Sequence, residues 1–145
     1  MKVLLTALNS KYIHTNLAVR SLQQFAAQRG YRSQIAEYTI NQHLPDLIDA
    51  LDRQRTDVLL LSCGGPEVSF HSEELLRQHP ALDGILYGEG EVSFLEYLQY
   101  QNGERPLSQV HSLVWRDGEQ IVCNPAADPL PMEQLPFAYS DLEQL

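Results

Sequence analysis

Ile85-Leu86-Tyr87-Gly88-Glu89-Gly90-Glu91 is the stretch that decides the fold class of this 145-residue chain. The three apolar residues predict the end of a buried strand, and the pattern from Val92 to Tyr100 predicts a helix. The glycine-acid turn between them is therefore expected at the carboxyl end of a strand. In parallel α/β sheets ligands collect at that edge, where the amides of the following helix point outward.

A second turn of the same kind, Gly64-Gly65-Pro66-Glu67, directly follows the apolar run Val58-Leu59-Leu60-Leu61-Ser62-Cys63. Parallel strands end at one edge, so the two turns are expected to converge there. Neither matches Gly-x-Gly-x-x-Gly or a Walker lysine loop. Because glycine also permits tight turns that bind nothing, both interpretations stay open. Glu89 and Glu91 would repel a phosphate, whereas Glu89 is suited to accept a hydrogen bond from an amide.

Strands and helices alternate along the rest of the chain, which indicates an α/β fold with a mostly parallel sheet of about four strands. The first expected helix uses Asn16 or Thr15 as its N-cap and Gly30 as its stop, and its apolar face comprises Ala18, Leu22, Phe25 and Ala26. The last one packs Phe94, Leu95 and Leu98. The expected strands are 2–8, 33–39, a central strand at 57–62, and 84–87; the expected helices are 16–29, 44–54, a short one from Ser72 ended by Pro80, and 92–101.

The residue pattern after the last expected helix no longer alternates between strand and helix. Two apolar segments flank Asp117-Gly118, which predicts a β-hairpin with a two-residue loop. Four prolines then occur between Asn124 and Leu145, a composition typical of an extended linker. We therefore expect an α/β domain over residues 1–110, a hairpin appendage over 111–124 and a linker toward an absent C-terminal domain over 125–145.

Composition narrows the function classes. The net charge is −9, and the ten basic residues are scattered, so nucleic acid is not an expected partner. No apolar run approaches the roughly 20 residues of a membrane span, and the start lacks a signal-peptide layout, which predicts a cytoplasmic protein without a membrane partner. The two cysteines, Cys63 and Cys123, are 60 positions apart and form no metal or redox pair.

Four segments stand in a fixed order along the chain: Asn9-Ser10-Lys11-Tyr12-Ile13-His14-Thr15-Asn16-Leu17-Ala18, Gly64-Gly65-Pro66-Glu67-Val68-Ser69, Gly88-Glu89-Gly90-Glu91-Val92-Ser93-Phe94, and the hairpin that leads into Leu135-Pro136-Phe137. Together they resemble the N-terminal cobalamin-binding domain of B12-dependent radical SAM proteins, a group that includes relatives of the anaerobic magnesium-protoporphyrin IX monomethyl ester cyclase. Each segment is weak alone, but their order is fairly specific and covers nearly the whole chain. The resemblance implies a flavodoxin-like (Rossmann-like) three-layer sandwich that presents cobalamin over its carboxyl edge.

The same resemblance implies a set of cofactor-binding residues and a partner domain. In such proteins a radical SAM domain follows, with S-adenosylmethionine and a [4Fe-4S] cluster, but two cysteines cannot supply its Cys-x-x-x-Cys-x-x-Cys motif. The chain is therefore not expected to be catalytic alone, and it carries no expected metal-ligand set. The expected cofactor-binding residues are Asn9, Tyr12, Ser62, Gly64, Gly65, Pro66, Glu67, Gly88, Glu89, Gly90 and Glu91.

Two departures from the family pattern leave an alternative open. In the family a further helix and strand, about 30 residues, normally separate a strand like the one ending at Cys63 from the Gly-Gly-Pro turn, whereas here Cys63 joins Gly64 directly. A natural deletion, an engineered one and an omitted segment would all explain this. The motif Asp-x-His-x-x-Gly is also absent. His14, in the loop after the first strand, has a small chance of ligand contact, and the other four histidines are expected at the surface. The alternative is a non-catalytic interaction or scaffold domain that keeps the fold without the cofactor.

Overall fold

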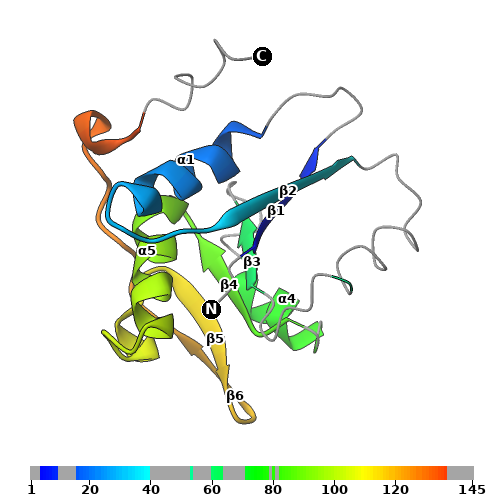
Figure 1. Ribbon diagram of the computed structural model, residues 1–145. Helices are drawn as coiled ribbons and strands as arrows, with labels where there is room; N and C mark the ends of the chain where they lie inside the picture. Colours follow the sequence, from blue (N-terminus) through cyan, green and yellow to red (C-terminus); the bar gives the residue numbers. More distant parts are fainter. Residues whose placement is uncertain are drawn as a thin grey trace. The chain divides into compact units, whose positions relative to one another are not determined.

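The computed structural model describes residues 4–9, 16–39, 53, 60–63, 71–78, 80 and 82–136 (Figure 1). These residues form two compact units. None of the described helices is long and apolar enough to cross a membrane. The first unit contains β1 (Leu4–Asn9), α1 (Leu17–Ala27), β2 (Gln34–Thr39) and the 3-10 helix η2 (Met132–Gln134); the second contains β3 (Leu60–Cys63), α4 (Ser72–Gln78), β4 (Gly84–Tyr87), α5 (Gly90–Gln101), the 3-10 helix η1 (Leu107–Gln109), β5 (Leu113–Asp117) and β6 (Gln120–Cys123).

In the first unit, β1 and β2 pair in parallel, from Leu4 opposite Gln34 to Asn9 opposite Thr39. The predicted cap of α1 is confirmed, because the Asn16 side chain accepts hydrogen bonds from the backbone N–H of Ala18 at 3.1 Å and of Val19 at 3.4 Å.

The stop at Gly30 is also confirmed, since its φ of 90° is a left-handed conformation that favours glycine. Leu22, Phe25 and Ala26 are buried as predicted, but the expectation for Ala18 is wrong. Ala18 is exposed in the first turn of α1, and periodicity alone does not show where along a helix its buried face begins.

The second unit contains a four-stranded sheet in the order β3-β4-β5-β6. β3 pairs in parallel with β4, whereas β4 with β5 and β5 with β6 are antiparallel. Because β5 runs back along β4, the start of β5 and the end of β6 lie at the same edge as the end of β4. In the pair of β3 and β4, Ser62 lies opposite Leu86 and Cys63 opposite Tyr87.

The core of this sheet is small and apolar. Leu76, Ile85 and Val114 are almost completely buried and contact one another. Full burial of a side chain such as Ile85 contributes about 2 kcal/mol. Arg116 ties α4 to this core, because its guanidinium donates to the carbonyls of Leu76 and Leu82.

Helix α5 buries most of the residues predicted for it. Phe94 and Leu98 are buried as expected, and Leu95 is only half-buried. Two polar side chains of the same helix, Ser93 and Glu96, are buried as well. The apolar pattern therefore identified the helix but not its polar interior contacts.

The predicted hairpin is confirmed, with its loop displaced by one residue. Asp117 still pairs with Gln120, so the loop consists of Gly118 and Glu119. Only Gly118 has a positive φ, 62°, which is the pattern of a type II′ turn with glycine at its first central position. The hairpin was expected as an appendage, but β5 pairs directly with β4, so both of its strands belong to the main sheet.

The α/β class is thus confirmed at the level of helices packed with parallel and antiparallel strand pairs. The described residues contain parallel pairing only between β1 and β2 and between β3 and β4, so the flavodoxin-like sheet of about four parallel strands stays a prediction. Among these strands β3 ends the order of its sheet and is not central. The expected helix 44–54 lies outside the described residues except for Arg53, which is helical.

Candidate functional site

The turn after β4 has the conformation that the sequence suggests. Gly88 has a φ of 70°, and no atom outside its chain neighbours lies within 4 Å of the place where a Cβ would stand. A side chain here would be strained by the backbone, although the space itself is open. The turn therefore presents an exposed backbone at the carboxyl end of β4.

Glu89 occupies the N-cap position of α5 but does not cap the helix. Its backbone is extended, with φ −71° and ψ 120°, yet its side chain makes no hydrogen bond to the helix amides. One carboxylate oxygen, Oε2, instead accepts a hydrogen bond from the backbone N–H of Leu130 at 3.3 Å. Glu91 follows in the first turn, where the helix dipole favours an acid. The first turn of α5 thus lacks a side-chain cap.

The structure brings some of the predicted cofactor residues to one edge and leaves others elsewhere. Ser62 lies in β3, opposite Leu86 of β4. Its backbone is therefore close to the turn after β4, which contains Gly88, Glu89, Gly90 and Glu91. Asn9 ends β1, in the other unit. Tyr12, Gly64, Gly65, Pro66 and Glu67 lie outside the described residues, as does His14.

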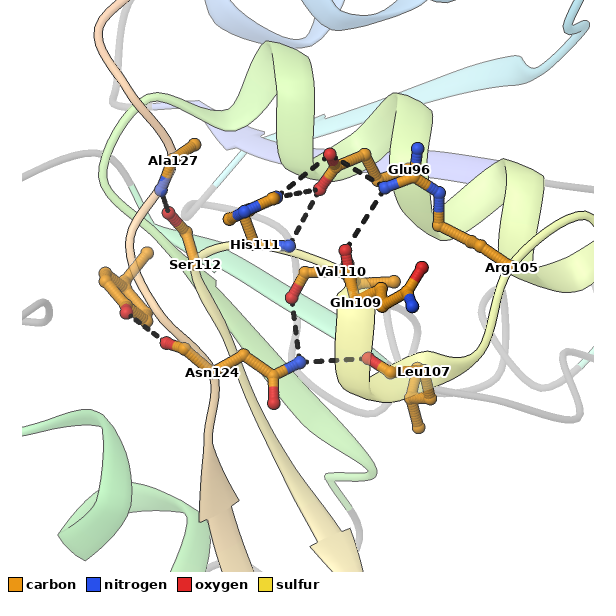
Figure 2. Close-up of polar contacts among 10 residues, drawn as sticks. Glu96, Arg105, Leu107, Gln109, Val110, His111, Ser112, Asn124 and Ala127 are labelled. Carbon is orange, nitrogen blue, oxygen red and sulfur yellow. Dashed lines mark hydrogen bonds and ion pairs between the residues drawn. The ribbon is translucent and has the colours of Figure 1, made fainter.

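The side chain of Asn124 is the most heavily bonded polar group at this edge (Figure 2). It is 4% exposed. Its amide nitrogen donates to the carbonyls of Leu107 at 2.9 Å and Val110 at 2.8 Å, and its carbonyl oxygen accepts from the indole of Trp115 at 3.2 Å. Removal of the amide would leave the carbonyl of Val110 and the indole of Trp115 without these partners, whereas the carbonyl of Leu107 also accepts from the backbone N–H of Val110 at 3.1 Å.

The backbone of Asn124 is held as firmly as its side chain. Its N–H donates to the carbonyl of Leu113 at 2.9 Å, and its carbonyl accepts from the phenol of Tyr87 at 2.7 Å. The chain then continues along the start of β5: the Ser112 N–H donates to the carbonyl of Pro125 at 2.8 Å, and the Ser112 hydroxyl accepts from the Ala127 N–H at 2.9 Å. The segment predicted as a linker therefore begins with a firmly bonded stretch.

Glu96 organises a second polar cluster, in the middle of α5 (Figure 2). Its buried carboxylate accepts from the backbone N–H of His111 at 2.7 Å and lies 3.0 Å from the Nδ1 of the same residue. Arg105 completes the cluster with an ion pair to Glu96 at 2.8 Å and a hydrogen bond to the carbonyl of Gln109 at 3.1 Å. These contacts close the loop between α5 and β5 beside an open hollow of about 390 Å³.

Tyr87 links the edge to a second hollow of about 400 Å³, which also contacts Cys123 and His71. Burial of the phenol and, next, the neighbouring Cys123 thiol raise the pKa of Tyr87 above its usual value. Cys123 is an exposed free thiol. His71 and His111 are exposed, as predicted, although His111 is bonded to Glu96. No group of three or more metal-ligating side chains occurs in the described part of the chain.

Sequence reasoning missed Asn124, Ser112 and Glu96. Ser112 has a positive φ of 53°, rare for a residue with a side chain, and it is buried. An acid on the apolar face of a predicted helix and an asparagine next to a proline were the available signals. Neither signal identifies a partner, because the partners are backbone and side-chain groups at least nine positions away in the sequence.

The comparisons with known proteins agree with the resemblance. No protein-family model matches the chain. It is 33% identical over 82 residues to the cobalamin-dependent radical SAM methyltransferase TokK of Streptomyces tokunonensis, covering 56% of this chain and 12% of that protein. It is 29% identical over 82 residues to the anaerobic magnesium-protoporphyrin IX monomethyl ester cyclase of Synechocystis, covering 57% of this chain and 16% of that protein.

The structural comparison covers almost the whole chain. The cobalamin-dependent S-adenosylmethionine radical enzyme OxsB, solved with aqua-cobalamin and S-adenosylmethionine bound, matches with a TM-score of 0.70 and 15% identity. The match covers 97% of this chain and 25% of OxsB. The resemblance to B12-dependent radical SAM proteins is thereby confirmed, and the chain spans only a small part of the length of the proteins it matches.

Proposed function

We propose that this chain is the cobalamin-binding module of a radical SAM enzyme, holding the corrin for chemistry performed by a downstream domain. The observation that carries the proposal is the likeness to OxsB over 97% of the chain, because OxsB was solved with both aqua-cobalamin and S-adenosylmethionine bound. The partial identity to TokK supports the same function. The module would have a flavodoxin-like sheet, with residues 1–110 as the domain, 111–124 as the hairpin and 125–145 as the connection onward.

The described residues around the turn after β4 fit such a ligand. Gly88 leaves open space beside the backbone, and the first turn of α5 has amides without a side-chain cap. Ser93, in the same helix, has a buried hydroxyl without a hydrogen-bond partner among the described residues. An amide-fringed macrocycle would offer donors to Glu89 and acceptors to the helix amides, whereas the two acids disfavour a pyrophosphate.

The proposed cofactor residues are those that the resemblance implies. Gly88, Glu89, Gly90 and Glu91 would contact the ligand at the β4 turn and Ser62 at the end of β3, together with Asn9, Tyr12 and residues 64–67. Bound cobalamin would supply cobalt chemistry, and S-adenosylmethionine and the [4Fe-4S] cluster would belong to the downstream radical SAM domain. This chain's own residues would bind and orient the corrin.

A titration with hydroxocobalamin tests the proposal, with the corrin absorption and the heat of binding as readouts. We expect saturable one-to-one binding, and Gly88→Leu should abolish it, because a side chain at this position projects into the open space of the turn. Gly103→Leu is the matched control: its φ of 78° and its open surroundings impose a similar strain away from the turn. Binding that survives Gly88→Leu would exclude this turn as the site.

A non-catalytic scaffold domain is the second candidate, favoured by the direct junction of Cys63 and Gly64. A version with a helix-strand unit restored between these residues separates the two functions. Binding only by the restored chain would place the defect at the junction. If neither version binds hydroxocobalamin, the scaffold function is supported and the cobalamin proposal fails.

A further inference from the structure

Ser112 combines two properties that rarely occur together in one residue. Its φ of 53° is a left-handed conformation, and every other residue with a positive φ in the described part of the chain is a glycine. Ser112 is also only 3% exposed. The Cβ of an L-residue disfavours this conformation, so a buried serine keeps it only where the surrounding contacts hold it there.

The N–H, the hydroxyl and the carbonyl of Ser112 each have a partner. The N–H donates to the carbonyl of Pro125 at 2.8 Å, and the hydroxyl accepts from the N–H of Ala127 at 2.9 Å. The carbonyl accepts from the N–H of Tyr87 at 3.0 Å, which continues the pairing of β4 with β5 by one residue. Because Tyr87 directly precedes Gly88, the Ser112 carbonyl holds the last backbone N–H before the turn after β4.

The far end of the turn is linked to the same stretch of chain. Helix α5 begins at Gly90, and its buried Glu96 accepts a hydrogen bond from the backbone N–H of His111 at 2.7 Å (Figure 2). His111 and Ser112 are consecutive, so these two residues are bonded to α5 on one side of the turn and to the end of β4 on the other. Because φ sets the direction in which the chain leaves a residue, a negative φ at Ser112 could not keep both bonds.

We propose that Ser112 is a positioning residue for the turn after β4, because its left-handed conformation fixes the N–H of Tyr87 and so sets where Gly88 begins the turn. Ser112 is buried and acts through Tyr87, without contacting a ligand. A turn that is already ordered loses less conformational freedom when it binds a ligand. The benefit to a ligand rests on the proposed function, whereas the hold of Ser112 on the turn does not.

Two substitutions separate the conformation of Ser112 from its hydroxyl. Ser112→Ala and Ser112→Gly both remove the bond to Ala127, but only glycine adopts a positive φ without a penalty. If the conformation positions the turn, the alanine variant should release the N–H of Tyr87 more often than the glycine variant. A role confined to overall stability would instead change the protection of all amides of the sheet together.

Amide hydrogen exchange, followed by NMR, measures this release. The internal reference is the Asn124 amide, which donates to the carbonyl of Leu113. We expect the Tyr87 amide to exchange about fivefold faster in Ser112→Ala than in Ser112→Gly, while the rate of Asn124 differs by less than about twofold. Ser108→Ala and Ser108→Gly, at an exposed position of η1, form the control pair and should not differ in the exchange of Tyr87. Equal Tyr87 rates in the two Ser112 variants, or equal changes at Tyr87 and Asn124, would overturn the proposal.

The wild-type chain provides a check that needs no variant. The amides of Tyr87 and Asn124, corrected for their intrinsic rates, should be protected to within about tenfold of one another. An unprotected Tyr87 amide would overturn the proposal even if Ser112→Ala does not fold.

Hydroxocobalamin binding tests the consequence for a ligand. The dissociation constant should be about threefold or more higher for Ser112→Ala than for Ser112→Gly. Absence of binding by the wild type would contradict the proposed function but not the hold of Ser112 on the turn, which the exchange rates decide. Equal dissociation constants in the two variants, with wild-type binding intact, would overturn the role of Ser112 in a ligand site.

Discussion

The polar groups at the end of β4 fall into two contrasting regions. Asn124 and Glu96 are buried and each bonds to several backbone or side-chain groups, whereas Gly88 and Glu89 are exposed, and the Glu89 side chain makes one hydrogen bond, to Leu130. Buried polar groups with all their partners make a rigid framework, and exposed turns with few contacts open at little cost. The difference indicates that one region supports the edge while the other is available for a ligand.

Replacing Asn124 should have the largest effect on this contrast. Asn124→Leu keeps the approximate size but removes the donor to the carbonyl of Val110 and the acceptor of the Trp115 indole, and the carbonyl of Leu107 keeps only the backbone N–H of Val110. We expect a loss of about 3 kcal/mol in the free energy of unfolding. Urea unfolding measures it.

Asn102→Leu is the control for this substitution, because Asn102 is exposed and its side chain makes one long contact of 3.4 Å to Glu104. It should change the stability by less than about 0.5 kcal/mol. Similar losses of unfolding free energy in Asn124→Leu and Asn102→Leu would show that the buried hydrogen bonds of Asn124 contribute no more than those of an exposed side chain.

Glu96→Gln is expected to have the next largest effect. The substitution keeps the shape but removes the charge that pairs with Arg105 at 2.8 Å and reduces its bonding to His111. Because the Glu96 side chain is only 10% exposed, we expect a loss of about 2 kcal/mol in unfolding free energy. Glu73→Gln, at an exposed helix pair with Arg77, should cost under about 0.5 kcal/mol.

Local signals explain what the sequence predicted correctly in this molecule. Asn16 caps the helix that follows it, Gly30 ends that helix, and Gly118 turns the hairpin, and all three act on residues within a few positions. The turn at Gly88 belongs to the same class, since a glycine with a left-handed conformation can be expected between a strand and a helix.

Long-range contacts explain what the sequence did not predict. The Asn124 side chain donates to the backbone carbonyl of Leu107, 17 residues away, and the Asn124 backbone carbonyl accepts from the phenol of Tyr87, 37 residues away. The residue types do not show which distant groups will bond to one another. The hydrogen bonds that hold the start of the expected linker could therefore not be predicted from the sequence. The one-residue shift of the hairpin loop has a similar origin, because Asp117 suits a turn but is used in pairing with Gln120.

The hydrogen bond of Tyr87 to Asn124 predicts a pH dependence of the free energy of unfolding. The phenol of Tyr87 donates to the carbonyl of Asn124, so Tyr87→Phe should lower the unfolding free energy by about 1 kcal/mol at pH 8. Burial raises its pKa above 10.0, so the folded state holds the phenolic proton more tightly than the unfolded state. This contribution is fully present below pH 10 and is lost as the pH rises through the raised pKa.

Urea unfolding between pH 8 and pH 11 checks this prediction. The wild type should lose stability above pH 10 more steeply than Tyr87→Phe, which keeps the dependence from Tyr97, whose pKa burial also raises. Parallel curves for the two proteins would show that the phenol of Tyr87 does not contribute to the framework.

Glu89→Asp should have the smallest effect, and in the opposite direction. Position 89 already has the extended backbone of an N-cap, but the Glu89 side chain bonds to Leu130 and leaves the α5 amides without a cap. A shorter carboxylate reaches those amides, so the unfolding free energy should rise by about 0.5 kcal/mol while hydroxocobalamin binding weakens. Asn16→Ala, which removes a cap that is made, should instead lower it by about 1 kcal/mol. A stabilised Glu89→Asp with undiminished binding would mean that the uncapped turn has no role in holding a ligand.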